Sequence, residues 1–244
     1  MWAGDENMKL AIFDIDGTLT NTNGVDNGCF VKALSEAHAI TEINTDWATY
    51  LHTTDSGIML QIFQEKFGRD PEDSELDKFK SCFVNMLSER YHSDSSSFTE
   101  VTGASVALSR LKRESDWSVA IATGSWRESA LLKLRAAKID VDGIPAAFAE
   151  DGLSREEILL SAVSQSLKRY RVSRFAKIVS IGDGLWDVRT ARRLNFAFVG
   201  VGCGETARSL DRAGAKRVIG NFADYSPLVS FLNEAQIPRA ECFK

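Results

Sequence analysis

The fold is decided by the stretch Lys9-Leu-Ala-Ile-Phe-Asp-Ile-Asp-Gly-Thr18, in which an apolar run stops abruptly at two aspartates and a glycine. Such a run is typical of a buried strand that enters a polar turn. Three later segments have the same character and also stop at Thr, Gly or Asp: residues 117–122, 176–181 and 195–199. Helical spacing follows each of these three, over residues 127–138, 185–194 and 205–213.

Strands that are apolar throughout and alternate with helices are typical of a parallel sheet that is covered on both faces. Two weaker strands are expected at residues 146–149 and 217–219. The fold class predicted from this order is α/β, with a Rossmann-like parallel sheet as the core and helices on both of its faces.

About a hundred residues separate the first expected strand from the second, far more than a simple crossover between parallel strands requires. Most of this segment, about residues 23–93, shows helical spacing of apolar residues, and turn-rich stretches bound it at 20–24 and 93–97. We therefore expect an inserted all-helical cap domain at residues 21–97. The catalytic core would consist of residues 1–20 and 98–244.

Composition excludes several classes of protein. The chain has 244 residues, of which 44% are hydrophobic and 26% charged, as in a folded globular protein. A net charge of −5 provides no positive field for nucleic acid or an anionic membrane surface. The sequence has no apolar run of the roughly 20 residues that a membrane helix needs. Scattered cysteines and an acidic start predict a cytoplasmic protein. The oligomeric state is left open between a monomer and a homodimer.

Carboxylates follow two of the expected strands. In an open parallel sheet, ligands bind beyond the carboxyl ends of the strands, which is where Asp14, Asp16 and Asp183 would lie, with Asp187 at the start of the next helix. Several carboxylates in one partly dry site repel one another unless a cation lies among them. Because the set contains oxygen ligands alone, the expected ion is Mg²⁺.

A phosphate site is expected next to this metal site. The hydroxyl of Thr123 and the backbone N–H groups of Gly124 and Ser125 follow a strand and precede a helix, a position suited to a phosphate oxygen. Asp14 would act as the nucleophile and form a phospho-aspartyl intermediate, and Asp16 would act as general acid and base. The expected partner is a small phosphorylated metabolite.

A basic residue must hold the aspartate and phosphate charges together, and Arg155 is the candidate. It stands in Leu153-Ser-Arg-Glu-Glu157, where Ser154 and Glu157 are spaced as a capping box at the start of a helix.

These residues resemble the four motifs of the haloacid dehalogenase superfamily, in order: Asp14-Ile-Asp-Gly-Thr18, Thr123, Arg155 and Gly182-Asp-Gly-Leu-Trp-Asp187. The long helical insert after the first motif is similar to the subfamily with a mobile helical cap, of phosphoglycolate-phosphatase type. The resemblance implies that Asp14 is nucleophile and metal ligand, that Asp16 is acid/base and a ligand through its carbonyl, and that Asp183 is a metal ligand. Asp187 would be a supporting carboxylate of the metal site, and the alternative is a charge at the start of a helix that interacts with the helix dipole. Thr123 and Arg155 would bind the phosphoryl group.

The third motif departs from the family pattern, which usually offers Lys followed by Pro, whereas Arg155 is followed by Glu156. Arginine keeps the charge and adds a bidentate fork. Lys133, Lys138 and Lys168 are alternatives for the same role.

The polar stretch His52-Thr-Thr-Asp-Ser-Gly57 interrupts the helical pattern of the insert. In a cap that closes over the site, this loop would meet the leaving group of the substrate, with Thr54 and Asp55 as contacts. An ordinary turn between two helices, with Asp55 or Ser56 as a helix cap, is the alternative.

The function expected from these features is Mg²⁺-dependent hydrolysis of a small phosphate monoester. A phosphosugar mutase or a phosphonate hydrolase of the same superfamily would use related residues, and a phosphate-sensing module without enzymatic activity is a further alternative.

Overall fold

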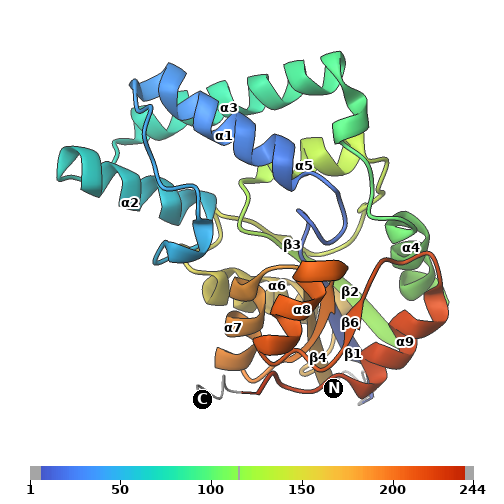
Figure 1. Ribbon diagram of the computed structural model, residues 1–244. Helices are drawn as coiled ribbons and strands as arrows, with labels where there is room; N and C mark the ends of the chain where they lie inside the picture. The colour runs from blue at the N-terminus through green and yellow to red at the C-terminus, as the bar shows by residue number, and fades with distance from the viewer. Residues whose placement is uncertain (1–6, 115, 240–244) are drawn as a thin grey trace.

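The computed structural model describes residues 7–114 and 116–239 and contains one six-stranded parallel sheet (Figure 1). The strand order is β3-β2-β1-β4-β5-β6. The strands are β1 (Lys9–Phe13), β2 (Trp117–Ala122), β3 (Ala146–Ala147), β4 (Lys177–Gly182), β5 (Ala197–Val201) and β6 (Val218–Ile219). All six strands expected from the sequence are confirmed; β1 and β2 have the expected bounds, and the ends of the others are displaced by at most two residues.

Helices cover both faces of this sheet, because successive residues of each strand point to opposite sides. Ala11 and Phe13 of β1 belong to one apolar cluster, which also contains residues of α4 (Ala104–Glu114) and α9 (Tyr225–Glu234). Leu10 and Ile12 belong to another cluster, with residues of α6 (Arg155–Tyr170). The predicted α/β class with a Rossmann-like core is confirmed.

The remaining core helices are α5 (Arg127–Ala136), α7 (Leu185–Arg193) and α8 (Gly204–Arg212), each close to its expected range. Helices α4 and α9 have no counterpart among the helices expected from the sequence. Leu228 and Leu232 of α9 have the i, i+4 spacing of one buried face, and both are fully buried against the sheet.

Three longer helices lie between β1 and β2 in the chain and form the upper, blue-to-green part of Figure 1. They are α1 (Asn23–His38), α2 (Asp55–Phe67) and α3 (Asp73–Ser93), with short 3-10 helices η1 (Trp47–Thr49) and η2 (Ser95–Ser97). Phe30, Phe63, Phe79 and Phe83 are buried together in their own apolar cluster. We refer to residues 21–97 as the cap; the exact boundaries of the two domains stay a prediction.

Trp126 connects the core to this aromatic cluster. It belongs to the loop after β2, but its side chain is buried in the apolar cluster of the cap. The Trp126 ring stacks on Phe30, with centroids 6.4 Å apart, and meets Phe79 edge to face at 5.6 Å. The cap is therefore docked on the core through a core side chain.

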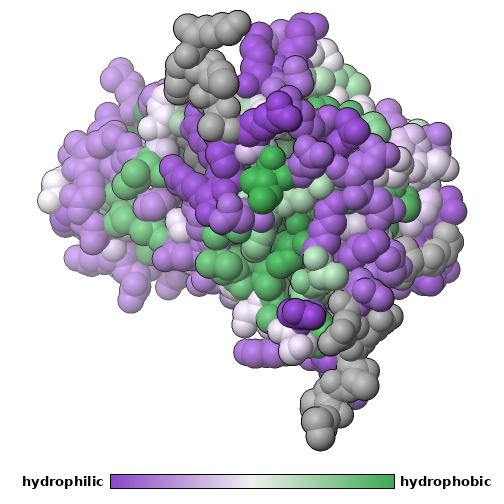
Figure 2. Space-filling model, turned by 90° about the horizontal axis from the view of Figure 1, so that it is seen from below, coloured by the Kyte–Doolittle hydropathy of each residue, from purple (hydrophilic) through white to green (hydrophobic). Residues whose placement is uncertain are grey.

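The face of the core that lies away from the cap is shown in Figure 2, where apolar residues gather between polar ones. A groove at the N-terminal ends of β4 and β5 is lined in part by Phe175, Ile178, Leu194, Phe196 and Ile237. Among the described residues, no helix combines the length and the apolar character that crossing a membrane requires.

Candidate active site

The three central strands bring the first, second and fourth motifs to one edge of the sheet. β1 lies between β2 and β4, and its last residue, Phe13, is level with Ile121 and with Ile181. Because all three strands run in the same direction, the residues that follow them, Asp14, Thr123 and Asp183, emerge at the same edge. The backbone N–H of Asp14 donates to the carbonyl of Ile181 at 3.0 Å, which ties the first motif to the fourth.

Gly17 allows the turn after β1 to approach Asp183. Its φ of +73° lies in the left-handed region, and a Cβ at this position would lie only 1.9 Å from Asp183 Oδ2. The same oxygen accepts a hydrogen bond from the side-chain amide of Asn23 at 3.0 Å. Glycine is thus required both by the backbone conformation and by the carboxylate beside it.

Asp14, Asp183 and Asp187 form an acidic cluster. Each offers a carboxylate oxygen, and these oxygens all lie within 4.8 Å of one another. Asp187 comes from the first turn of α7, where its Oδ2 also accepts the backbone N–H of Gly184 at 3.0 Å. The Oδ1 atom of Asp183 is buried and has no hydrogen-bond partner among the described residues.

The surroundings of this cluster disfavour its negative charges. Burial, together with the charge of Asp14, raises the pKa of Asp183 to about 7. The same two causes raise the pKa of Asp187 well above its usual value, and burial also raises that of Asp14. A divalent cation would remove this penalty, and three carboxylates with a free oxygen lone pair are a donor set that suits Mg²⁺.

Arg155 stands at the first position of α6, after the predicted capping box of Ser154 and Glu157, which is confirmed. Its Nη1 lies 3.3 Å from Asp14 Oδ1 and 3.3 Å from Asp187 Oδ1, and its Nε donates to the carbonyl of Thr53 at 2.9 Å. A single side chain therefore contacts the expected nucleophile Asp14, the acidic cluster and the cap.

Of the three lysines considered in place of Arg155, none takes this position. Lys168 lies thirteen residues along α6, roughly 20 Å away at the rise of an α-helix. Lys138 is exposed and follows α5. Lys133 does enter the site, but its contacts are with Asp16 rather than with Asp14.

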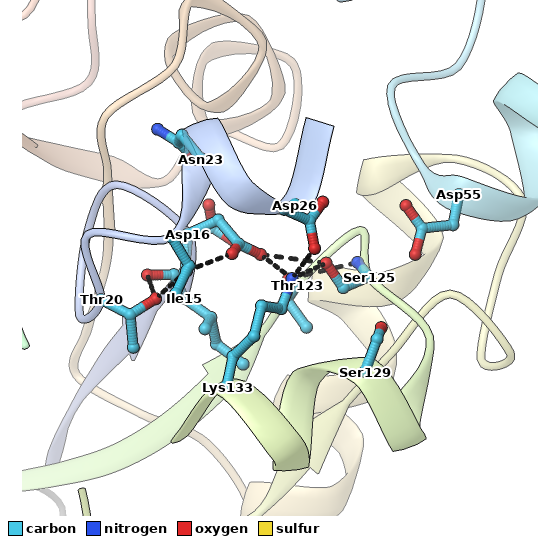
Figure 3. A network of polar contacts seen from close by, with 12 residues as sticks. Ile15, Asp16, Thr20, Asn23, Asp26, Asp55, Thr123, Ser125, Ser129 and Lys133 are labelled. Carbon is cyan, nitrogen blue, oxygen red and sulfur yellow. Dashed lines mark hydrogen bonds and ion pairs between the residues drawn. The ribbon is translucent and has the colours of Figure 1, made fainter. Parts of the chain in front are cut away.

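Lys133 is fully buried and forms the centre of a second charged group (Figure 3). Its Nζ lies 2.5 Å from Asp16 Oδ2, 2.6 Å from Asp26 Oδ1 and 3.0 Å from the hydroxyl of Ser125. The hydroxyls of Ser125 and Thr22 also donate to the Asp16 carboxylate, at 3.0 Å and 2.6 Å. Three donors therefore hold the Asp16 carboxylate: the Lys133 ammonium and the hydroxyls of Ser125 and Thr22.

The contacts of Lys133 change the pKa values of both carboxyl groups. Burial alone would raise the pKa of Asp16, but the Lys133 ammonium and its hydrogen bonds overcome this effect and lower it. Asp26 lacks the two hydroxyl donors, so burial prevails over Lys133 and raises its pKa to about 6. The resting site thus favours an ionised Asp16.

Asp26 was not identified by sequence reasoning. It lies in the first turn of α1, where an acidic residue is common for its interaction with the helix dipole. Its contact with Lys133 joins residues 107 positions apart in the chain, and neither residue carries a motif.

The predicted phosphate-binding residues lie together at the base of a cavity. Thr123, Gly124 and Ser125 all line it, and the N–H of Ser125 donates to Thr123 Oγ1 at 3.2 Å. A Cβ on Gly124 would lie 2.8 Å from the carbonyl of Thr53 and 2.9 Å from the Arg155 guanidinium, so this turn is closely covered.

The loop at residues 52–57 meets the site, as the sequence predicts, but with different roles for its two candidates. Asp55 lines the cavity, and its carboxyl accepts the backbone N–H of Trp126 at 2.9 Å. Burial raises the pKa of Asp55 to about 8, and the neighbouring charge of Asp26 acts in the same direction. The structure does not bring Thr54 to the cavity, because its hydroxyl donates to the carbonyl of Leu153 and accepts the N–H of Gly57 as the N-cap of α2. Thr53 lines the cavity in its place.

The cavity between core and cap has a volume of about 170 Å³. Its base consists of Asp14, Asp16, Arg155 and the turn 123–125, and α1, η1 and the start of α2 supply the opposite wall. The site therefore brings together the carboxylates of Asp14 and Asp16, the Arg155 cation and an acidic cluster that could hold a metal ion, around one small cavity.

Comparison with known proteins agrees with this geometry. A model of the family described as haloacid dehalogenase-like hydrolase matches residues 8–195. No curated protein matches the chain in sequence.

Solved structures share its fold. A hydrolase from Pseudomonas syringae is 23% identical, with a TM-score of 0.66 over 93% of this chain and 99% of that one. A candidate beta-phosphoglucomutase from Bacteroides vulgatus is 15% identical, with a TM-score of 0.66 over 94% and 90% of the two chains. A predicted phosphoglycolate phosphatase from Haemophilus somnus is 17% identical, with a TM-score of 0.59 over 91% and 98%.

Proposed function

Because the chain belongs to the haloacid dehalogenase-like hydrolase family, we propose that it is a Mg²⁺-dependent phosphatase that hydrolyses a small phosphate monoester through a phospho-aspartyl intermediate. The observation that carries this proposal is the position of Asp14. Its carboxylate belongs to the acidic cluster, contacts Arg155 and lines the same cavity as Asp16.

In the first step, a carboxylate oxygen of Asp14 attacks phosphorus, and the bond from phosphorus to the ester oxygen breaks. Arg155, Thr123 and the backbone of Gly124 would hold the other phosphoryl oxygens. The leaving oxygen takes the proton of Asp16, and the products are an alcohol and phospho-Asp14. Asp16 must be protonated at this point, and the negative charge of the bound phosphoryl group opposes the lowering of its pKa by Lys133.

In the second step, Asp16 takes a proton from water, whose oxygen attacks the phosphorus of phospho-Asp14. The bond from phosphorus to the Asp14 oxygen breaks, which releases inorganic phosphate and regenerates the carboxylate. Lys133 would hold Asp16 in place during both steps. Its ammonium group and the Ser125 hydroxyl both donate to the Oδ2 atom of Asp16.

The metal would be held by the carboxylates of Asp14, Asp183 and Asp187 and by the main-chain carbonyl of Asp16. When bound, it neutralises negative charge on the phosphoryl oxygens and on the cluster. Asp183 and Asp187 keep their carboxylates in position through Asn23 and the N–H of Gly184.

We further propose that the protein acts in the cytoplasm on a phosphorylated metabolite. The described thiols, Cys29, Cys82 and Cys203, are free, which suits a reducing compartment. Cys242 lies outside the described residues.

The test is release of inorganic phosphate from p-nitrophenyl phosphate with Mg²⁺ and with EDTA. We expect turnover only with Mg²⁺, and loss of it in Asp14→Asn. A stable phosphoprotein would support the phosphate-sensing module instead. Transfer of the phosphoryl group to a sugar hydroxyl rather than to water would support a mutase, which shares the nucleophile.

A further inference from the structure

The wall of the cavity that faces the leaving group differs in charge from the base that faces the phosphoryl group. Among the described lining residues, the one cation is Arg155, and it belongs to the base, where it contacts Asp14 and Asp187. The cap contributes Asp26 and Asp55, two asparagines and apolar side chains, but no lysine or arginine.

The buried lysine does not change this balance. Lys133 lies between Asp16 and Asp26, and Figure 3 shows its ammonium group pointing at these two carboxyl groups and at Ser125. One positive charge thus faces two carboxylates, so the group as a whole is not positive. A second anion on the substrate would meet Asp26 without a cation to pair with it, and burial of an unpaired charge is costly.

The same wall is suited to hydroxyl groups. Asn27 is exposed at the cavity and can both donate and accept hydrogen bonds. Trp47 of η1 is a further residue of this wall, and its buried indole N–H group has no acceptor among the described residues. The same holds for Trp186, which lines the cavity from α7 of the core. Phe30 and Ile58 add apolar surface against which carbon-bound hydrogens can pack.

The volume limits how much of the leaving group the cavity can hold. About 170 Å³ is less than the roughly 300–1,000 Å³ of pockets that enclose drug-sized ligands, and the phosphoryl group occupies part of it. What remains accommodates a short carbon chain.

We infer that the leaving group is a short, uncharged, hydroxyl-bearing carbon chain, so that the substrate class is a small polyol or sugar monophosphate with no second anionic group. This inference rests on the proposed function, because the cavity is taken as the site of phosphate ester hydrolysis. It disfavours esters whose alcohol carries a carboxylate and the bisphosphates that a phosphosugar mutase requires.

The test compares two esters of nearly equal size, 2-hydroxyethyl phosphate and phosphoglycolate, which differ in a hydroxyl against a carboxylate. We expect kcat/KM to be at least about tenfold higher for 2-hydroxyethyl phosphate, the discrimination that follows from one unpaired charge. An equal or higher value for phosphoglycolate would overturn the inference.

The variant Asn27→Lys adds a cation to the cavity wall at an exposed position of α1. We expect it to raise kcat/KM for phosphoglycolate about tenfold relative to 2-hydroxyethyl phosphate. Gly28→Lys is the matched control, since it adds the same charge one residue further along the helix, outside this lining and in open space. An equal change in this kcat/KM ratio in both variants would contradict the assignment of Asn27 to the cavity wall that faces the leaving group.

Hydrolysis of p-nitrophenyl phosphate, measured in parallel, separates the two proposals. If no ester is hydrolysed, the proposed function fails and the inference with it. If the aromatic ester alone is hydrolysed, or phosphoglycolate is preferred, the enzyme is a phosphatase and only the substrate class is wrong.

Discussion

The ammonium group of Lys133 lies 2.5 Å from the carboxylate of Asp16, and the same nitrogen lies 2.6 Å from Asp26. Asp16 belongs to the core and Asp26 to the first helix of the cap, so one buried cation joins the proposed acid/base residue to the wall of the cavity.

Lys133→Met would leave Asp16 and Asp26 facing each other without a cation. Removing one partner of a buried ion pair costs about 3–5 kcal/mol, so we expect a loss of that order in the free energy of unfolding. Urea denaturation measures it. Lys168→Met, an exposed lysine on α6, is the control and should change stability little. The double variant Lys133→Met with Asp26→Asn should recover part of the loss, and no recovery would show that the pair is not the cause.

Arg155→Met removes the cation beside Asp14. We expect kcat/KM for a phosphate monoester to fall by about 100-fold or more, because the charge that holds the phosphoryl oxygens is lost. Arg155→Lys should fall between this variant and the natural protein, since lysine keeps the charge but lacks the fork that reaches Asp14 and Thr53 together. Arg193→Met, an exposed arginine paired with Glu156, should leave steady-state kinetics unchanged. Equal activity of Arg155→Met and the natural protein would remove Arg155 from the site.

The acidic cluster links stability to pH. Burial raises the pKa of Asp183 to about 7 in the folded protein, against 3.8 for a free aspartate side chain, so the unfolded chain binds fewer protons between these two pH values. Stability without metal therefore falls as pH rises from about 4 to about 7, and the raised pKa of Asp187 acts in the same direction. The proposed Mg²⁺ would bind the ionised cluster, so its stabilising effect should grow over this range. Thermal unfolding with EDTA or excess Mg²⁺ at pH 5, 6, 7 and 8 tests this; an equal effect of Mg²⁺ at pH 5 and pH 8 would contradict the metal site.

Gly17→Ala should abolish activity, because the added Cβ would force Asp183 out of place. Gly68→Ala provides a close control: Gly68 has a φ of +68°, nearly the same as the +73° of Gly17, but open space around it. In both variants an alanine must adopt a positive φ, which lowers the free energy of unfolding by about 1 kcal/mol. Only Gly17→Ala should also lose the stabilisation by Mg²⁺, and retention of that stabilisation would show that Asp183 is not displaced.

The sequence predicted the core well because each strand is an apolar run with polar residues directly after it. Asp14, Thr123 and Asp183 meet since they follow adjacent parallel strands, and this holds for any sheet with this order. The role of Lys133 and the presence of Asp26 could not be predicted in this way. Their contact depends on how the cap packs against the core. Helical spacing shows which residues share a face of a helix, but not which residues of another element that face contacts.

Thr53 lines the cavity in place of the predicted Thr54 for a similar reason. Sequence shows that the loop at 52–57 is polar, but the direction of each side chain depends on where α2 begins, and Thr54 is used to cap that helix. Thr53 contacts Arg155 through its main-chain carbonyl. Every residue type has this group, so the identity of residue 53 does not reveal the contact.

Trp126 is buried among the aromatic rings of the cap, so the environment of its indole depends on whether the cap is packed against the core. Swinging the cap away from the sheet would withdraw this indole from Phe30 and Phe79 into water, two residues after the proposed phosphate-holding Gly124. Any opening of the cap during turnover would have to break these ring contacts, so the packing around Trp126 would contribute to the barrier for that motion.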